Sequence, residues 1–327
     1  MFSLLITLAS LGQVQAPEAT SFLIEEAANL EPLATTDIAR EFLAAAKAAK
    51  PIAPRTIYRK GRTREWLSTT DYEKLTVADK AKWQALEVGD MMYHGLFYGT
   101  PSAYVLLLEQ LGRADGPKSL KGLKIADFGH GGIGQLRLNA EQGAEAVGID
   151  VDPIQQLLYS EKGDQGAVGD KGGSVRLVHG RFPTDAKIVE QVGEDFDIFL
   201  SKNTLKRGYV HPEREANPAA LINLGVTDEA YVAAVSKLLK PGGWFVIYNL
   251  SPAQNPTDKP YLPHADGRSP FARELLEKAG FEVIHFDVDD SANARRFGTL
   301  IGWDKPPSSM KLETDLFAWV TICRKKQ

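Results

Sequence analysis

The second half of this chain contains a series of short apolar runs, and no other feature of the sequence restricts the possible fold as much. From residue 121 onward, five such runs alternate with segments of helical periodicity: "LKIADF", "AVGID", "VRLVHG", "FDIFLS" and "WFVIYN". Polar residues or glycine bound each run, as in strands that a parallel sheet buries on both faces. The alternation predicts an α/β fold with a doubly wound, mostly parallel sheet.

The preceding region, residues 17–120, has a different pattern. The segments "TTDIAREFLAAAKAAKP", "TTDYEKLTVADKAKWQALE" and "SAYVLLLEQLG" carry helix start and stop signals, among them a capping box from Thr70 to Glu73. Between the first two lies the basic segment "PRTIYRKGRTREW". We interpret it as a solvated linker, with a lip that attracts an anionic substrate as the alternative. The sequence therefore predicts a helical N-terminal region on the substrate side, followed by the sheet domain over residues 121–327.

The first residues, "MFSLLITLASLGQVQA", resemble a secretory signal peptide over positions 1–16. An apolar core is followed by Val14-Gln15-Ala16, a small-x-small cleavage pattern, although the usual basic residue near the start is missing. The apolar run is too short to span a bilayer. We expect export if this segment is cleaved, and a cytoplasmic protein otherwise.

Composition and charge narrow the function classes. The formal net charge of −4 favours neither a nucleic acid nor an anionic membrane as a partner. Cys323 is the single cysteine, which excludes an internal disulfide and a CxxC-type zinc site. The six histidines show no metal-ligand spacing. We expect no bound metal, no nucleic acid and no membrane span, and the sequence leaves the oligomeric state open.

The stretch "IADFGHGGIGQ" joins the first apolar run to a helix and has the spacing of a nucleotide-binding turn. Gly129, Gly131 and Gly134 fit G-x-G-x-x-G. Such glycines let the backbone turn sharply toward a ligand, and the next helix offers unpaired N–H groups. Asp150 follows 150 − 129 = 21 residues after the first glycine, where a carboxylate can accept hydrogen bonds from a ribose diol. A Walker-type loop is excluded, which leaves a dinucleotide or S-adenosylmethionine.

Residues from about 121 to 325 resemble the class I S-adenosylmethionine-dependent methyltransferases. Asp127, Gly129, His130 and Gly131 match the first motif of that family, a strand that ends in D-x-G-x-G. "VGIDVDP", "FDIFLSKN", "LLKPGGWFVIYN", "LLEKAGFEVIHF" and "DLFAWVTICRK" are similar to its later elements, in the same order. The resemblance implies a Rossmann-like sheet of seven strands with a terminal antiparallel strand, and S-adenosylmethionine as the cofactor.

The resemblance also implies roles for single residues. Asp127 would lie near the ammonium group of the methionine end, Asp150 at the ribose hydroxyls and Val151 against the adenine. After the third strand, Arg181 stands where the family often has an acid, and Phe182 would pack on the adenine face. These departures leave the adenine contacts the least constrained part of the expected site.

The end of the fourth strand reads Ser201-Lys202-Asn203-Thr204, with Ser201 expected at the cofactor. It differs from the Asp/Asn-Pro-Pro-Tyr/Phe of enzymes that methylate amino groups of nucleic-acid bases, which argues against such a substrate. A lysine that faced a sulfonium would be unfavourable, so we expect the Lys202 side chain to point away.

Methyl transfer needs alignment, exclusion of water and, for some acceptors, a base. His211, in the long loop after the fourth strand, is the candidate base, with Tyr209 or Tyr248 as positioning groups; a surface histidine is the plainer interpretation. The aromatic segment from Met91 to Tyr104 either closes over the cofactor or packs in the core.

Three functions follow for testing. The first is methyl transfer from S-adenosylmethionine to a small-molecule or protein acceptor. The second is an NAD(P)-dependent Rossmann oxidoreductase, although no Tyr-x-x-x-Lys arrangement is apparent. The third is a non-catalytic exported protein that keeps the fold.

Overall fold

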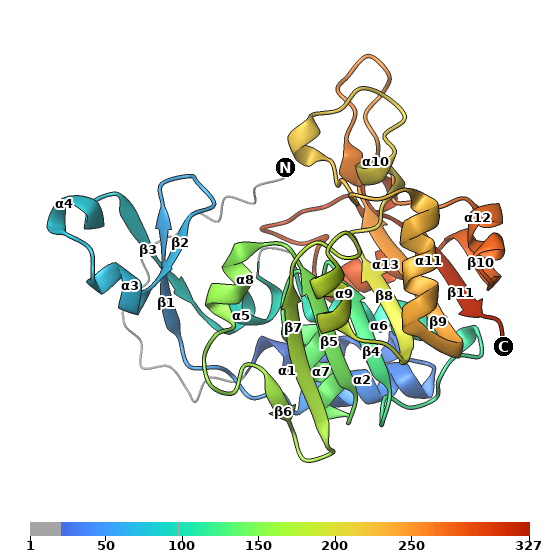
Figure 1. The fold of residues 1–327 in the computed structure, drawn as a ribbon, viewed down its shortest axis with the longest axis horizontal. Coiled ribbons are helices and arrows are strands. Elements are labelled where there is room, and N and C mark those ends of the chain that lie inside the picture. Colours follow the sequence, from blue (N-terminus) through green and yellow to red (C-terminus); the bar gives the residue numbers. More distant parts are fainter. Residues whose placement is uncertain (1–20, 97–98) are drawn as a thin grey trace.

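The computed structural model describes residues 21–96 and 99–327. The candidate signal peptide, residues 1–16, lies outside these ranges, and its cleavage stays a prediction. Within them, no helix has the length and apolar character needed to cross a bilayer. The chain forms one large sheet covered by helices, and a smaller sheet projects from one side (Figure 1).

The large sheet has eight strands in the order β10-β11-β9-β8-β4-β5-β7-β6. Their bounds are β4 (Lys124–Phe128), β5 (Glu145–Asp150), β6 (Gly166–Val168), β7 (Gly173–His179), β8 (Phe196–Lys202), β9 (Leu239–Ser251), β10 (Phe281–Asp289) and β11 (Phe317–Lys325). The five apolar runs form β4, β5, β7, β8 and β9, which are parallel to one another. The last strand, β11, is antiparallel to both neighbours. The doubly wound, Rossmann-like architecture is therefore confirmed; the short antiparallel edge strand β6 is an addition.

The order of the strands decides where a ligand can bind. From β4 the chain proceeds through β5 to β7 on one side, and then returns to β8 and β9 on the other side. In open sheets of this kind, ligands bind beyond the carboxyl ends of the strands at the point where the order reverses. That point lies between β4 and β8.

Side chains alternate along the buried strands and supply two cores. In β8, Phe199 belongs to the core beneath the later helices, whereas Ile198 and Leu200 belong to the core beneath the N-terminal helices. The helices of the sheet domain are α7 (Gly134–Glu141), α8 (Pro153–Leu158), α9 (Ala186–Val192), α10 (Arg207–Val210), α11 (Asp228–Leu238), α12 (Arg273–Lys278), α13 (Ser291–Leu300) and α14 (Leu312–Asp315), with the 3₁₀ turns Pro218–Ala220 and Pro263–Ala265. Helices α9, α11 and α12 lie on the front face in Figure 1.

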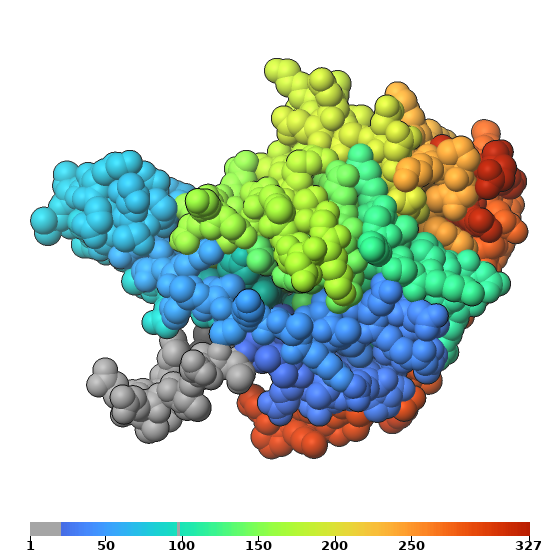
Figure 2. Space-filling model, turned by 90° about the horizontal axis from the view of Figure 1, so that it is seen from below, coloured from blue at the N-terminus to red at the C-terminus, as the bar shows by residue number. Residues whose placement is uncertain are grey.

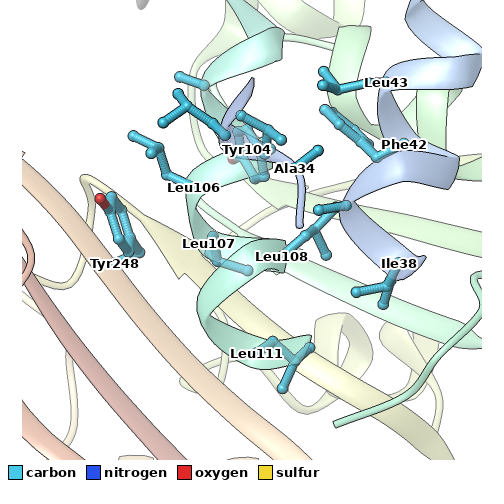
Figure 3. Close-up of a cluster of buried hydrophobic side chains, with 14 of the residues drawn as sticks. Ala34, Ile38, Phe42, Leu43, Tyr104, Leu106, Leu107, Leu108, Leu111 and Tyr248 are labelled. Carbon is cyan, nitrogen blue, oxygen red and sulfur yellow. The ribbon is translucent and has the colours of Figure 1, made fainter. Parts of the chain in front are cut away.

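Part of the N-terminal region is helical, as predicted. It contains α1 (Phe22–Leu30), a 3₁₀ turn (Glu31–Leu33), α2 (Asp37–Lys47), α5 (Asp90–Gly95), a second 3₁₀ turn (Pro101–Ala103) and α6 (Tyr104–Arg113). Apolar residues of α2 and α6 interdigitate, with Phe42 and Leu108 among the buried side chains (Figure 3). From below, the first helices form a continuous surface with the segment around residue 300 (Figure 2). The N-terminal helices thus form one wall of the sheet domain's core.

The prediction of a linker and a helix is wrong for residues 55–68 and 83–88, and it holds only for two short helices between them. Here the chain forms a three-stranded antiparallel sheet, β2-β1-β3, from β1 (Arg55–Lys60), β2 (Trp66–Ser68) and β3 (Trp83–Val88). Thr56, Ile57 and Tyr58 favour extended backbone, and Gly61, at φ +52°, allows the turn after β1. The two helices are α3 (Thr69–Glu73) and α4 (Val77–Lys80), and Ser68 and Thr76 cap them instead of the expected box from Thr70 to Glu73.

Tight packing of α7 on the sheet yields a first prediction. A Cβ at Gly173, the first residue of β7, would overlap the carbonyl oxygen of Ala140 in α7. We expect Gly173→Ala to lower the free energy of unfolding by about 1–3 kcal/mol, because main-chain atoms on both sides must move. Gly89 has an ordinary φ of −84° and open space around its Cβ position, so Gly89→Ala is the matched control. Equal urea midpoints for the two variants would contradict the contact.

Candidate functional site

A cavity of about 800 Å³ opens at the reversal point of the strand order. The glycine turn after β4 lines it together with the ends of β5 and β8. The rest of the wall comes from the start of α6, the turn after β7, the loop after β8, the loop after β9 and parts of the N-terminal region, among them Arg64 and Gly95. The two loops rise above the carboxyl ends of the strands (Figure 1, around α10). A cavity of this size and position is suited to a small ligand or cofactor.

Two glycines shape the floor of the cavity. Gly129 and Gly131 have φ values of +71° and +67°, which residues with a Cβ rarely adopt. The Thr204 hydroxyl donates to the carbonyl of Gly129 at 3.1 Å, and a Cβ at Gly129 would strike the Thr204 side chain. The spacing seen in the sequence therefore reflects a real close turn at these two positions.

The third glycine of the pattern has a different role. Gly134 does not line the cavity; a Cβ there would lie 2.7 Å from both the carbonyl oxygen of His94 and the ring of Pro101. Gly132 meets the same His94 carbonyl. The start of α7 is thus covered by the N-terminal region, and the assignment of Gly134 to the ligand is corrected to a packing role.

Asp150 is held at the rim of the cavity by backbone amides. Its Oδ2 accepts from the N–H of Gly131 at 3.1 Å, and its Oδ1 accepts from the N–H groups of Val151 and Asp152 at 2.7 and 3.0 Å. A carboxylate has about four acceptor positions, so one remains for a ligand hydroxyl. Asp150 and the exposed Val151 both line the cavity.

His130 is the remaining residue of the first motif, and it lines the cavity as expected. Its side chain is 5% exposed, and its Nδ1 lies 3.0 Å from the carbonyl oxygen of Gly132. This contact within the glycine turn limits the rotation of the imidazole. His130 therefore contributes a held ring to the wall.

Asp127 lies directly behind the cavity wall. Its Oδ2 accepts from the hydroxyl of Tyr104 at 2.8 Å and from Nε2 of Gln135 at 2.9 Å, and both donors line the cavity. Its Oδ1 has no hydrogen-bond partner within the described part of the chain. Burial raises the pKa of this carboxyl to about 6, despite these two donors. A buried carboxylate with one oxygen free of hydrogen bonds can pair with a cationic group that binds nearby.

The residues expected at the adenine divide into two groups. Phe182 is 2% exposed and Arg181 is exposed, and both line the cavity, so both are available to a ligand. Ser201 is fully buried and does not line it; its hydroxyl donates to the carbonyl of Phe128 at 3.1 Å and accepts from the N–H of Leu205. The assignment of Ser201 to the cofactor is corrected: it joins the end of β8 to the end of β4.

The three expected catalytic residues do not come together. Tyr209 lines the cavity. His211 does not; its imidazole is 48% exposed and lies 2.8 Å from Asp228. Tyr248 is fully buried in the cluster that contains the apolar side chains of α2 and α6 (Figure 3). Its hydroxyl donates to Asp290. The predictions of His211 as the base and of Tyr248 as a positioning group are therefore corrected. Tyr248 is buried because the alternation of side chains along β9 turns it toward the core.

Lys202 is the main residue that the sequence analysis placed wrongly. Instead of pointing away, its side chain lines the cavity, with Nζ 5.3 Å from the ring centroid of Tyr104. Burial lowers its pKa to about 8, and Asp127 partly offsets this. Its position as the last residue of β8, at the edge where ligands bind, was the signal that could have identified it.

Lys206, four residues later, is also buried at the cavity but is fully engaged. Its Nζ donates to the carbonyl oxygens of Leu250 and His264 and to the Ser251 hydroxyl. An ammonium has three donors, so all of them are used. Lys206 therefore holds the loops after β8 and β9 together.

The described residues include no group of three or more His, Cys, Asp or Glu side chains placed to hold a metal ion. Cys323 is fully buried in β11, and burial raises the pKa of its thiol to about 12. That thiol is thus kept protonated and away from the cavity.

Comparison with known proteins gives similarity to solved structures only. No protein-family model and no curated protein matches the chain. The phospholethanolamine N-methyltransferase 2 of Haemonchus contortus, in complex with phosphomonomethylethanolamine and S-adenosylhomocysteine, is 13% identical with a TM-score of 0.41, over 75% of this chain and 63% of that chain. An S-adenosylmethionine dependent methyltransferase from Mesorhizobium loti is 16% identical, with a TM-score of 0.39, over 65% and 95%. The [4+2]-cyclase SpnF is 17% identical, with a TM-score of 0.36, over 63% and 75%. Similarity at this level assigns no activity.

Proposed function

We propose that this chain is a methyltransferase that transfers a methyl group from S-adenosylmethionine to a small-molecule or protein acceptor. One arrangement carries the proposal: the Gly129–Gly131 turn and the backbone-held carboxylate of Asp150 line one cavity, with the unused oxygen of Asp127 behind its wall. A ribose diol and an α-ammonium are the two groups of this cofactor that carboxylates recognise.

The site residues fit such a cofactor in a definite order. Asp150 would hold the ribose through its remaining acceptor position, and Val151 and Phe182 would border the adenine. Tyr104, Gln135 and Asp127 would face the methionine end. When bound, the cofactor supplies a methyl group already activated by its sulfonium. The protein's contribution is to align the acceptor and to exclude water.

The oxidoreductase alternative needs a pyrophosphate at the start of α7. In a Rossmann fold that group lies at the helix N-terminus and needs close backbone approach there. Gly132 lines the cavity, and packing of Gly134 against the N-terminal region is compatible with either ligand. The titration below therefore has to distinguish the two cofactors.

Lys202 is the feature that a sulfonium does not favour by itself. Its charge is partly offset by Asp127 behind the wall, and the cavity is lined by Asp150 as well as by the cationic side chains of Arg64, Arg181 and Lys206. A non-catalytic protein of this fold would bind the cofactor without turning it over. Measuring both binding and turnover therefore separates the remaining alternatives.

Isothermal titration with S-adenosylhomocysteine and, separately, with NAD⁺ tests the proposal. We expect binding of the first and none of the second, and Asp150→Ala should weaken the first about tenfold because it removes a charged acceptor. Asp228→Ala, which removes the partner of His211 outside the cavity, is the control and should bind as the parent does. If NAD⁺ binds and S-adenosylhomocysteine does not, the proposal is wrong.

A further inference from the structure

The cavity continues into a side chamber of about 190 Å³ that the proposed cofactor does not account for. Trp303, Met310 and Leu316 contribute its apolar wall. Lys202 and Asn203 line both the main cavity and the chamber, so they stand where the two meet. The chamber therefore has a lysine at its border with the main cavity.

Lys202 is nine-tenths buried, at 8% exposed, without a charged partner in contact. In the described part of the chain its Nζ makes no hydrogen bond and no ion pair within 4 Å; it lies 5.3 Å from the ring centroid of Tyr104. Burying an ammonium in this state is costly unless a partner of opposite charge arrives. The lysine is thus placed to receive an anion.

A second donor lies beside it. The Oδ1 of Asn203 accepts from the N–H of Leu250 at 2.7 Å, which orients the amide. Its Nδ2 has no hydrogen-bond partner among residues 21–96 and 99–327. Lys202 and Asn203 line the same two cavities, and an ammonium and an amide N–H are the donors that the two oxygens of one carboxylate accept from.

The charged groups around this point differ between the two cavities. Asp127, behind the wall of the main cavity, accepts from Tyr104 and Gln135 and partly offsets the charge of Lys202. Asp315, the acid of the side chamber, accepts from the N–H of Lys311 and from the hydroxyl of Thr314. Arg64, Arg181 and Lys206 line the main cavity only, so Lys202 is the one cationic side chain among the described residues of the chamber, which suits a monoanion there better than a phosphate.

We infer that the methyl acceptor is a carboxylic acid with an apolar body, whose carboxylate pairs with Lys202 and Asn203 while the apolar part enters the chamber of Trp303, Met310 and Leu316. That the bound acid is a methyl acceptor rests on the proposed function; that an acid binds here does not. The carboxylate is the group by which Lys202 and Asn203 recognise the molecule.

The test compares phenylacetate with its neutral amide, phenylacetamide, by isothermal titration, with and without saturating S-adenosylhomocysteine. We expect the acid to bind at least about tenfold more tightly than the amide, as for a hydrogen-bonded charge pair. Lys202→Met should remove this preference. Lys240→Met is the control. Lys240 lies near the start of β9, whereas Lys202 lies at the end of the neighbouring parallel strand β8, and Lys240 pairs with Asp197.

Two outcomes overturn the inference: equal binding of acid and amide, including no binding of either, or a preference for the acid that survives in Lys202→Met. Trp303→Ala provides a second readout, because it should weaken the binding of phenylacetate and leave the binding of acetate unchanged. The comparison within the parent protein stands even if a variant fails to fold. If the parent protein prefers the acid but does not bind S-adenosylhomocysteine, the proposed function is contradicted and the acid site is not.

Discussion

Replacing Arg55 by methionine is expected to lower the free energy of unfolding by about 3–5 kcal/mol, as when one partner of a buried ion pair is removed. The Arg55 guanidinium forms a two-pronged pair with Asp164 at 2.7 and 2.8 Å and donates to the carbonyl of Leu158. Asp164 is 1% exposed, so the variant leaves a buried carboxylate without its cation. Urea unfolding followed by circular dichroism measures the loss.

Two further variants separate charge from packing. Arg62→Met alters an exposed arginine at the tip of the same small sheet and should change stability by less than about 0.5 kcal/mol. Adding Asp164→Asn to Arg55→Met should recover part of the loss, since the buried group is then neutral. A parent-like midpoint for Arg55→Met would show that the small sheet is anchored by other contacts.

The Asp127→Asn variant should bind S-adenosylhomocysteine about 10–100-fold more weakly, because a hydrogen bond or close pairing with a charged group is lost. The asparagine keeps an acceptor for Tyr104 and Gln135. Binding of 5′-methylthioadenosine, which lacks the amino-acid part, should not change. An equal loss for both ligands would place Asp127 at the nucleoside instead.

The same variant should alter the dependence of stability on pH. Burial raises the pKa of Asp127 from 3.8 to about 6, so between these values the folded state binds a proton that the unfolded state has lost. The contribution of this group is fully present below pH 3.8 and is lost as the pH rises through about 6. The stability of Asp127→Asn relative to the parent should therefore increase by up to about 3 kcal/mol between pH 3.5 and 7.5. A flat difference across that range would contradict a buried, ionised Asp127.

Much of the sheet could be predicted from the sequence because its cause is local and repeated. Runs such as "LKIADF" and "FDIFLS" are apolar on both faces, and only a covered parallel sheet buries both. In contrast, β1 and β3 are short and exposed on part of their surface, so they carry no clear period. The capping box expected from Thr70 to Glu73 pointed to a helix start in this region, but the helices there are capped by Ser68 and Thr76 and have only about one turn each.

The same distinction applies to the site. Asp127, the Gly129–Gly131 turn and Asp150 follow directly from strand ends, and chain order alone brings them to one edge. The sequence thus determined the sheet and this half of the cavity. Only the tertiary structure decided that Gly134 packs, that Tyr248 is core, that His211 lies outside and that Lys202 lines the cavity. The direction of a side chain depends on what packs against it, and those neighbours come from segments distant in the sequence.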